Sequence, residues 1–573
     1  MKTVNEIKQI FMNGELKFAT VSGVWTTKPN LIRRVDDEIN AIEIITTKSF
    51  QVKATPGNRE PIIGEVAVGS FVNAVGLRNP GMRVAHKELK KLYDEKPLRS
   101  ILNVSIAGNS PEDFIELVKK FEDVADMFEL NFSCPHAKPG YGSSIGTSPE
   151  LIKEYMQAIR PHTKLALFPK LTPNVDDIGK MAKIAVDAGA DGIAAINTTG
   201  PMEYIDPTSG EAVLYNPNGH KGGKSGEHIF EVALEKIKEI RNAVGANVPI
   251  LGMGGVSRGS QVRAMQKAGA NAIGVGSVIA RVIDEKYKEY FESLRYDTEN
   301  QTDTAATFLS VKRLAKYKEY TIKTINALSE TMWDIELEGA PILFNASQYA
   351  FIWIPGIGEK PFGIVANSPL RFIARLREIN PRSKKGKFTK GLFKKKTGDK
   401  LYVRGPYGKT MPENSMSHVY IVSGGTGLAL VPKLAESLAA LGRFVTVYHG
   451  VSDEKEICYQ DLIEPYAKLN VIPDNGKPGR VLDDLADELD RIESNDCTIY
   501  SIGPDILMEK ALELAESKVC DPKYCYASLE TNNMCGIGMC GECECGGVLS
   551  CKNGTFYDYN FLKKHYFNKN NNK

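Results

Sequence analysis

The sequence lacks the features that mark membrane-spanning, secreted or nucleic-acid-binding proteins. Its 573 residues include 72 Lys+Arg and 70 Asp+Glu, a formal net charge of +2, so it has no excess of positive charge of the kind that nucleic-acid binding requires. No apolar run reaches the roughly 18 residues of a membrane span, and the first residues, "MKTVNEIKQIFMNG", lack the apolar core of a signal peptide. We therefore expect a cytoplasmic protein that binds neither nucleic acid nor a membrane.

Cysteine is scarce and unevenly distributed. The chain has 10 cysteines, and seven of them lie between Cys520 and Cys551. A secreted protein stabilised by disulfides would spread its cysteines through the fold, whereas a cluster of cysteines in a reducing compartment indicates a metal site. Within this region we expect Cys520 and Cys525 to be plain thiols.

The spacing of the remaining clustered cysteines predicts an iron–sulfur centre. Cys535, Cys540 and Cys543 are arranged as C-x₄-C-x₂-C, and Cys551 follows eight residues later. This is the plant-type spacing for a 2Fe–2S cluster, which needs four thiolates. Zinc is the alternative metal, but a zinc site would more naturally use two C-x₂-C pairs, and this segment has one. Cys545 is a possible rival to Cys551 as the fourth ligand.

The first half of the chain alternates short apolar runs with amphipathic helical segments. The apolar runs are "FATVSGV", "AIEIITTK", "ILNVSIAG", "FELNFSCP", "LALFPKLTP", "GIAAINTTG", "PILGMGGV" and "AIGVGSV". Strands that alternate with helices predict a parallel sheet with helical crossovers. Eight strands in this length favour a (β/α)₈ TIM barrel, with an open α/β sheet as the alternative. Each run ends in polar or glycine-rich residues, and in a barrel these ends share one rim, where active sites lie.

The rest of the chain predicts three smaller domains after a barrel domain at residues 1–315. The segments "YTIKTINAL", "MWDIELEG" and "YAFIWIP" predict a small antiparallel β-barrel over residues 316–415. The stretch "HVYIVSGGTGLALVPKLAESLAAL" reads as a strand, a glycine-rich turn and a helix, which predicts a nucleotide-binding α/β domain over residues 416–518. The cysteine-rich tail then occupies residues 519–573.

Many of these motifs occur together, and in the same order, in one enzyme family. In the barrel they are "ELNFSCP", "KLTPN", "INTTG", "GGKSG", "GMGGV" and "GVGS"; further along they are "WIPGIGEKPFGIV", "GDKLYVRGPYG" and "CGIGMCGEC…SCKNGTF". The first set resembles the catalytic subunit of class 1B dihydroorotate dehydrogenases, and the second set resembles their ferredoxin-reductase-like electron-transfer subunit. The chain departs from the family at Gly363, where Ser is usual, and at Ala429-Leu430, where Ala-Pro is usual. The resemblance implies that both subunits are fused into one polypeptide.

Glycine-rich turns after the seventh and eighth strands predict a phosphate site. Barrels bind phosphate at this position through backbone N–H groups, and the resemblance makes the ligand the phosphate of FMN. A lysine near the N1 edge of a flavin stabilises the negative charge of the reduced ring, and Lys170, at the end of the fifth strand, is the candidate. The FMN contacts that the resemblance implies are Ser22, Gly23, Lys48, Lys170, Asn197, Gly226, Gly254, Gly255, Gly276 and Ser277.

Asparagines near the strand ends predict recognition of a planar ring. Asn73, Asn131 and Asn197 can each offer donors and acceptors, as a pyrimidine with alternating C=O and N–H groups requires. Lys48, at the end of the second strand, could reach flavin and substrate together. The substrate contacts that the resemblance implies are Lys48, Asn73, Gly76, Leu77, Asn131, His136, Asn197 and Thr198.

The motif "NFSCPH" carries the expected catalytic base. Oxidation of dihydroorotate sends a hydride to the flavin and requires a base for a proton on the opposite face of the ring. The resemblance assigns this role to Cys134, positioned by Asn131 and Ser133. His136 stands where the family has asparagine. A histidine there also resembles dihydropyrimidine dehydrogenases, which act on uracil and thymine.

The second half is expected to bind FAD and NAD. A glycine-rich loop between a strand and a helix can approach a pyrophosphate, although such a loop alone is a weak signal. The resemblance implies nucleotide contacts at Pro361, Phe362, Thr389, Gly424 and Gly425. It also implies a homodimer that forms through the barrel.

The sequence therefore predicts an enzyme that oxidises dihydroorotate to orotate at FMN and passes electrons through a 2Fe–2S cluster and FAD to NAD⁺. Its partners would be a small pyrimidine and a nicotinamide nucleotide. Two alternatives stay open. The same electron chain could act on a uracil-type pyrimidine, or the barrel could be an inactive docking domain of an electron-transfer module.

Overall fold

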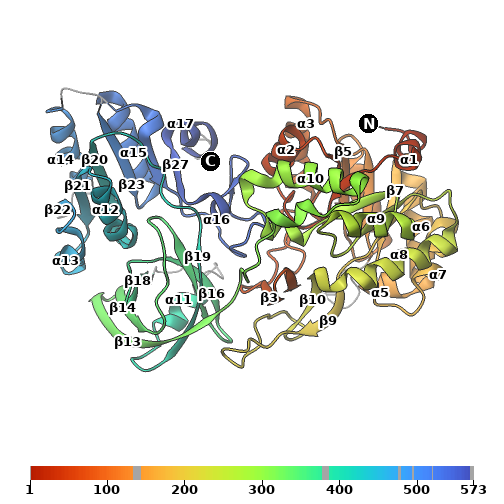
Figure 1. Cartoon of the computed structure of the whole chain (residues 1–573), viewed down its shortest axis with the longest axis horizontal. Coiled ribbons are helices and arrows are strands. Elements are labelled where there is room, and N and C mark those ends of the chain that lie inside the picture. The colour runs from red at the N-terminus through yellow and green to blue at the C-terminus, as the bar shows by residue number, and fades with distance from the viewer. Residues whose placement is uncertain are drawn as a thin grey trace. The chain divides into compact units, whose positions relative to one another are not determined.

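The structure, a computed structural model, describes residues 2–132, 143–376, 386–474, 479–492, 496–518 and 520–567. It divides into two compact units (Figure 1). The first unit consists of Met1–Ala315 and Ile537–Gly547, and the second of Lys316–Gly536 and Val548–Lys573. A short piece of the cysteine-rich tail therefore belongs to the first unit. No helix in the described ranges is long and apolar enough to cross a membrane.

The first unit contains a closed barrel of eight parallel strands. In order around the barrel they are β1 (Phe18–Thr20), β12 (Ala272–Val275), β11 (Ile250–Met253), β8 (Ile193–Ala195), β7 (Ala166–Leu171), β6 (Met127–Asn131), β5 (Ile101–Ile106) and β2 (Ile42–Thr46). Each strand overlaps one of the eight apolar runs of the sequence, and only β6 begins one residue before its run. The predicted TIM barrel is confirmed, and the alternative of an open sheet is wrong.

The helices around the barrel form because apolar residues recur on one face, and some of them also have a capping side chain at the first turn. Helix α4 (Pro111–Phe121) is an example: the Ser110 hydroxyl accepts a hydrogen bond from a backbone N–H of the first turn, and Phe114 and Phe121 lie on its buried face. The other principal helices of this unit are α2 (Pro29–Glu38), α3 (Met82–Glu95), α6 (Pro149–Ile159), α7 (Ile178–Asp187), α8 (Phe230–Val244), α9 (Gly259–Ala268) and α10 (Tyr287–Asn300).

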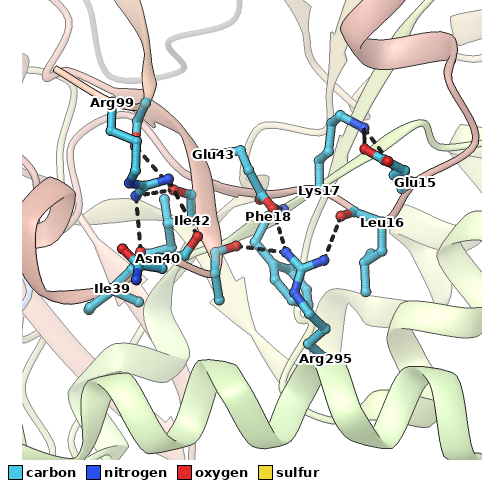
Figure 2. Close-up of polar contacts among 12 residues, drawn as sticks. Glu15, Leu16, Lys17, Phe18, Ile39, Asn40, Ile42, Glu43, Arg99 and Arg295 are labelled. Atoms are coloured by element: carbon cyan, nitrogen blue, oxygen red, sulfur yellow. Dashed lines mark hydrogen bonds and ion pairs between the residues drawn. The ribbon is translucent and has the colours of Figure 1, made fainter.

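Arginine side chains bind the backbone at the amino-terminal ends of the first two barrel strands (Figure 2). Arg295, on α10, donates to the carbonyl oxygen of Leu16 at 2.9 Å and forms an ion pair with Glu43 on β2. Arg99 donates to the carbonyl oxygen of Ile42 at 2.8 Å. These contacts satisfy carbonyl groups that the strands leave unpaired. They stabilise this end of the barrel, so the opposite end is the one available for chemistry.

A small antiparallel sheet lies in the loops that follow the carboxyl ends of two barrel strands. Its order is β3 (Ile63–Ala67), β4 (Ser70–Asn73), β10 (Lys221–Gly226) and β9 (Thr199–Glu203). In its register Asn73 pairs with Gly223, and Gly226 pairs with Ser70. The sequence analysis did not predict this sheet, which brings two distant segments of the chain to the same rim.

The second unit begins with a seven-stranded antiparallel sheet. Its order is β16 (Gly358–Gly363), β15 (Tyr349–Ile354), β19 (Lys400–Tyr407), β13 (Lys318–Ser329), β14 (Met332–Glu338), β18 (Leu370–Arg375) and β17 (Ala366–Asn367). The antiparallel pairing was predicted. In the described part of the chain, β16 and β17 are the end strands of this hydrogen-bonded order, and closure of the sheet into a barrel stays a prediction.

The unit also contains a six-stranded α/β sheet. Its order is β22 (Lys468–Pro473), β21 (Phe444–Val451), β20 (His418–Gly424), β23 (Cys497–Ile502), β24 (Cys525–Ser528) and β27 (Phe556–Asp558), and only β27 runs antiparallel. Helices α12 (Val431–Ala440), α14 (Arg480–Leu489) and α15 (Asp505–Lys518) pack against it. Cys497 and Cys520 form a disulfide, so the expectation that Cys520 is a plain thiol is wrong.

Candidate active site

A cavity opens at the carboxyl ends of the barrel strands. Every described barrel residue that the sequence pointed to lines it: Ser22, Gly23, Lys48, Asn73, Gly76, Leu77, Asn131, Lys170, Asn197, Thr198, Gly226, Gly254, Gly255, Gly276 and Ser277. Ser133, Cys134 and His136 lie outside the described residues. The structure therefore brings the candidate residues to one site, and the individual role of each residue stays a prediction.

The glycine-rich end of the cavity leaves no room for side chains. Gly255 has a φ of +74°, and a Cβ atom there would lie 2.7 Å from the carbonyl oxygen of Gly226. Only glycine fits such a close approach of two backbone segments. The result is a concave surface of exposed backbone beside Gly276 and Ser277, which suits an anion that is bound by N–H groups.

A partly buried charge network adjoins this glycine-rich end. Arg281 lines the cavity and lies 2.7 Å from Glu227, and Arg258 lies 3.3 Å from the same carboxylate. Burial raises the pKa of Glu227, but the hydrogen bond from Ser257 and the charges of both arginines outweigh it, so the pKa lies below its usual value. Two cations therefore share one carboxylate, and this end of the cavity is net positive. The sequence analysis did not single out Arg281.

A chain of hydrogen bonds connects two of the predicted residues beneath the cavity. Asn131 donates to the hydroxyl of Ser49 at 3.0 Å; the hydroxyls of Ser49 and Ser105 are 2.9 Å apart; and Ser105 donates to Glu129 at 2.9 Å. The ammonium of Lys170 lies 3.5 Å from the fully buried Glu129. Glu129 precedes Asn131 by two residues on β6, so both side chains point to the same side of the strand. In the sequence, this spacing was the feature that could have placed Glu129 on the same side of the strand as Asn131.

Two other predicted asparagines are held by neighbouring backbone. The Asn73 carboxamide donates to the carbonyl oxygen of Gly223 at 3.2 Å, across the β4–β10 pair. The carboxamide oxygen of Asn197 accepts from the N–H of Thr198 at 2.7 Å. These contacts orient both amides, because an amide held through one group presents its other group in a defined direction.

The tail segment Ile537–Gly547 packs against the barrel within the first unit. The N–H of Trp25 donates to the carbonyl of Met539 at 2.8 Å, and the Thr27 hydroxyl donates to the carbonyl of Cys540 at 3.1 Å. At the next residue the chain also passes close to Thr27: Gly541 has a φ of +70°, and a Cβ atom there would overlap the Thr27 hydroxyl. As a result Met539 and Cys540 line the same cavity as the predicted barrel residues.

The same segment places a carboxylate against two cations of the cavity wall. Glu542 lies 3.2 Å from the ammonium of Lys48 and 3.1 Å from the guanidinium of Arg78. Burial raises the pKa of Glu542, but the charges of Lys48, Arg78 and Lys28 outweigh it, so the pKa lies below its usual value. Lys48 and Arg78 both line the cavity. Two cations again share one carboxylate, so the described side chains of this corner also carry a net positive charge.

All four predicted cluster ligands are buried. Cys540 and Cys543 belong to the first unit, and Cys535 and Cys551 to the second. Inside the second unit the carbonyl of Cys535 accepts from the buried guanidinium of Arg404 at 2.9 Å. The described residues contain no group of three or more His, Cys, Asp or Glu side chains arranged to hold a metal ion. The ligand assignment therefore stays a prediction from the spacing.

A second cavity lies within the second unit. Pro361 and Phe362, which were predicted as nucleotide contacts, line it, and so do Thr426 and Gly427 of the glycine-rich loop after β20. Thr389, Gly424 and Gly425, predicted for the same purpose, are not among the residues that line it.

The two departures from the family pattern in this unit meet at the second cavity. A Cβ atom on Gly363 would lie 2.9 Å from the side chain of Leu430 and 3.4 Å from that of Ala429. Leu430 therefore occupies space that a larger residue at position 363 would need. The two positions at which the sequence departs from the motifs that it resembles are thus in packing contact.

Comparison with known proteins matches the barrel to one family. The family model described as dihydroorotate dehydrogenase matches residues 18–287. The catalytic subunit of dihydroorotate dehydrogenase B (NAD(+)) from Methanocaldococcus jannaschii is 40% identical over 234 residues, 41% of this chain and 74% of the relative. The subunit of that name from Pyrococcus furiosus is 35% identical over 293 residues, 51% of this chain and 91% of the relative. That from Pyrococcus abyssi is 37% identical over 258 residues, 45% of this chain and 82% of the relative.

The packing of the tail segment on the barrel can be tested by Gly541→Ala. We expect the added methyl group to displace the segment from Thr27, so that backbone hydrogen exchange in residues 537–547 becomes faster by about tenfold or more. Gly245→Ala is the matched control, since Gly245 has a φ of +76° but nothing within 4 Å of its Cβ position. Unchanged exchange of residues 537–547 in Gly541→Ala would show that the close approach to Thr27 does not hold the segment.

Proposed function

Because the chain belongs to the dihydroorotate dehydrogenase family, we propose that it oxidises dihydroorotate to orotate in the barrel cavity and delivers the electrons to NAD⁺. The proposal has two parts. The barrel binds FMN and the pyrimidine, and the second half of the chain carries the electrons through a 2Fe–2S cluster and FAD. The first part is supported by the cavity and the relatives, and the second by sequence motifs and the second cavity.

The net positive corner at Lys48 and Arg78 is the observation that carries the choice of substrate. Dihydroorotate and orotate carry a carboxylate, whereas uracil-type pyrimidines do not. Two cations that share the single carboxylate of Glu542 favour a ligand that brings a further negative charge. The adjacent Asn73, Gly76 and Leu77 line the same cavity and offer polar groups for the ring.

The glycine-rich end of the cavity suits the phosphate of FMN. It offers backbone at Gly255 with no room for side chains, and the net positive charge of Arg281 and Arg258 against Glu227 lies beside it. FMN supplies a ring that accepts a hydride. On this proposal Lys170, held by Glu129, provides positive charge at the flavin edge.

The proposed base is Cys134. It follows Asn131 by three residues in the chain, and Asn131 is held in the cavity wall through Ser49. In the proposed reaction the Cys134 thiolate takes a proton from the ring on the face opposite the flavin. Asn73, Asn131 and Asn197 hold the polar edges of the pyrimidine.

Features of the cysteine-rich tail and of the second unit support the proposed electron-transfer path from the barrel to NAD⁺. The spacing of Cys535, Cys540, Cys543 and Cys551 is that of a 2Fe–2S cluster, and each of the four is buried. The second cavity, with Pro361, Phe362 and the loop at Thr426, is the proposed FAD site. A parallel α/β sheet with a glycine-rich loop after its first strand is the proposed NAD site.

The second candidate function is the oxidation or reduction of a neutral pyrimidine. His136 in place of the family's asparagine favours it, because that pattern resembles dihydropyrimidine dehydrogenases. The charge of the Lys48–Arg78 corner favours the anionic substrate, and we therefore place dihydroorotate first.

Anaerobic reduction of the bound flavin separates the two candidates. We expect dihydroorotate to bleach the flavin of the purified chain and dihydrouracil to leave it oxidised. Cys134→Ala should keep FMN bound but slow the reduction roughly 10²–10⁴-fold, the usual contribution of a general base. A flavin reduced by dihydrouracil and not by dihydroorotate would make the neutral pyrimidine the substrate. A flavin reduced by neither would favour an inactive barrel.

The cluster ligands can be tested with two neighbouring substitutions. Cys551→Ser should abolish iron binding and nicotinamide-linked turnover, while dihydroorotate still reduces an artificial acceptor that takes electrons at FMN. Cys545→Ser is the matched control and should keep both iron and turnover. If Cys551→Ser keeps its full iron content and Cys545→Ser loses iron, the fourth ligand is Cys545 and not Cys551.

A further inference from the structure

The carboxylate of Glu542 takes part in ion pairs of the barrel cavity, although it comes from the cysteine-rich tail and not from the barrel sequence. It lies in the tail segment Ile537–Gly547, which packs on the barrel through Met539 and Cys540. Its own backbone carbonyl accepts from the ammonium of Lys28 at 3.2 Å. Both its backbone and its side chain are thus held against the barrel, and its carboxylate reaches Lys48 and Arg78.

The cations that line the cavity are neutralised to different degrees. Lys170 has Glu129 at 3.5 Å. Lys48 and Arg78, in contrast, have only 9% and 29% of their side chains exposed and share Glu542, itself 14% exposed. Charges this far removed from water interact more strongly than surface ion pairs. Among the described side chains, Glu542 therefore supplies the negative charge of this corner. A cluster on Cys540 and Cys543 would add its own charge, which is the same in every variant compared below.

We propose that Glu542 is a positioning residue that sets how strongly the barrel cavity binds an anionic ring ligand. It holds Lys48 and Arg78 at the cavity wall and cancels half of their charge. The inference rests on the proposed function, since the anionic ligand it concerns is the carboxylate of dihydroorotate or orotate. It adds that a side chain of the cysteine-rich tail controls ligand affinity in the barrel.

The physical consequence is a selective effect on charged ligands. With the carboxylate present, the corner attracts one further negative charge and releases it readily. Without it, two cations face the ligand and the anion binds more tightly, whereas a neutral ring of the same shape gains nothing. The gain is electrostatic and must shrink as salt screens the charges.

The test measures the affinities of orotate and of uracil for the full-length, flavin-loaded chain. The change in flavin absorbance on ligand addition reports binding. For Glu542→Gln we expect orotate to bind about 3- to 10-fold more tightly at low salt, with uracil affinity unchanged. Raising the salt concentration to 0.5 M should remove most of the gain. Glu542→Asp keeps the charge and should stay close to the parent.

Glu544→Gln is the matched control. Glu544 lies two residues further along the same segment and accepts a hydrogen bond from Asn30 at 2.9 Å, and it does not line the cavity. Its substitution should leave both affinities unchanged. Equal changes for orotate and uracil in Glu542→Gln would reveal a merely structural role and overturn the inference. Orotate binding that is unchanged or weaker in Glu542→Gln, while the parent binds orotate, would also overturn the inference. If no variant binds orotate, the proposed function itself fails.

Discussion

Closure of the eight-stranded parallel barrel is the constraint on which the site depends. Because all eight strands run in the same direction, their carboxyl ends meet at one rim. Residues that are distant in the sequence, such as Lys48, Asn131, Lys170 and Gly254, therefore line one cavity. The amino-terminal end is occupied by arginine contacts to the backbone, such as those of Arg295, which leaves the other rim for chemistry.

Charge compensation within this cavity follows a consistent pattern. The described cations at its wall are each paired with a carboxylate, but in two corners two cations share one: Arg281 with Arg258 at the glycine-rich end, and Lys48 with Arg78 beside the proposed substrate. The proposed ligands, FMN and dihydroorotate, carry two anionic groups, a phosphate and a carboxylate. On the proposed function, the positive charge of these two corners would offset the negative charge of the two ligands.

Local sequence patterns predicted the barrel strands and the residues at their ends, because an apolar run followed by a polar or glycine-rich turn specifies both. The sheet β3-β4-β10-β9 was missed because two of its strands are rich in glycine and polar residues, as in "KGGKSG". The pairing of Lys48 with Glu542 joins residues 494 positions apart, and no local pattern reports such a contact. The Glu129–Lys170 pair could have been found from the i, i+2 spacing of Glu129 and Asn131.

The central claim is that one polypeptide both oxidises dihydroorotate and delivers the electrons to NAD⁺. The most direct test is to mix the purified chain anaerobically with dihydroorotate and NAD⁺, with no other protein present, and to measure orotate and NADH. The account predicts that the two products form in equal amounts over many turnovers. Flavin that is reduced by dihydroorotate while no NADH forms would contradict it, because the electrons would then need a separate partner protein to leave the barrel.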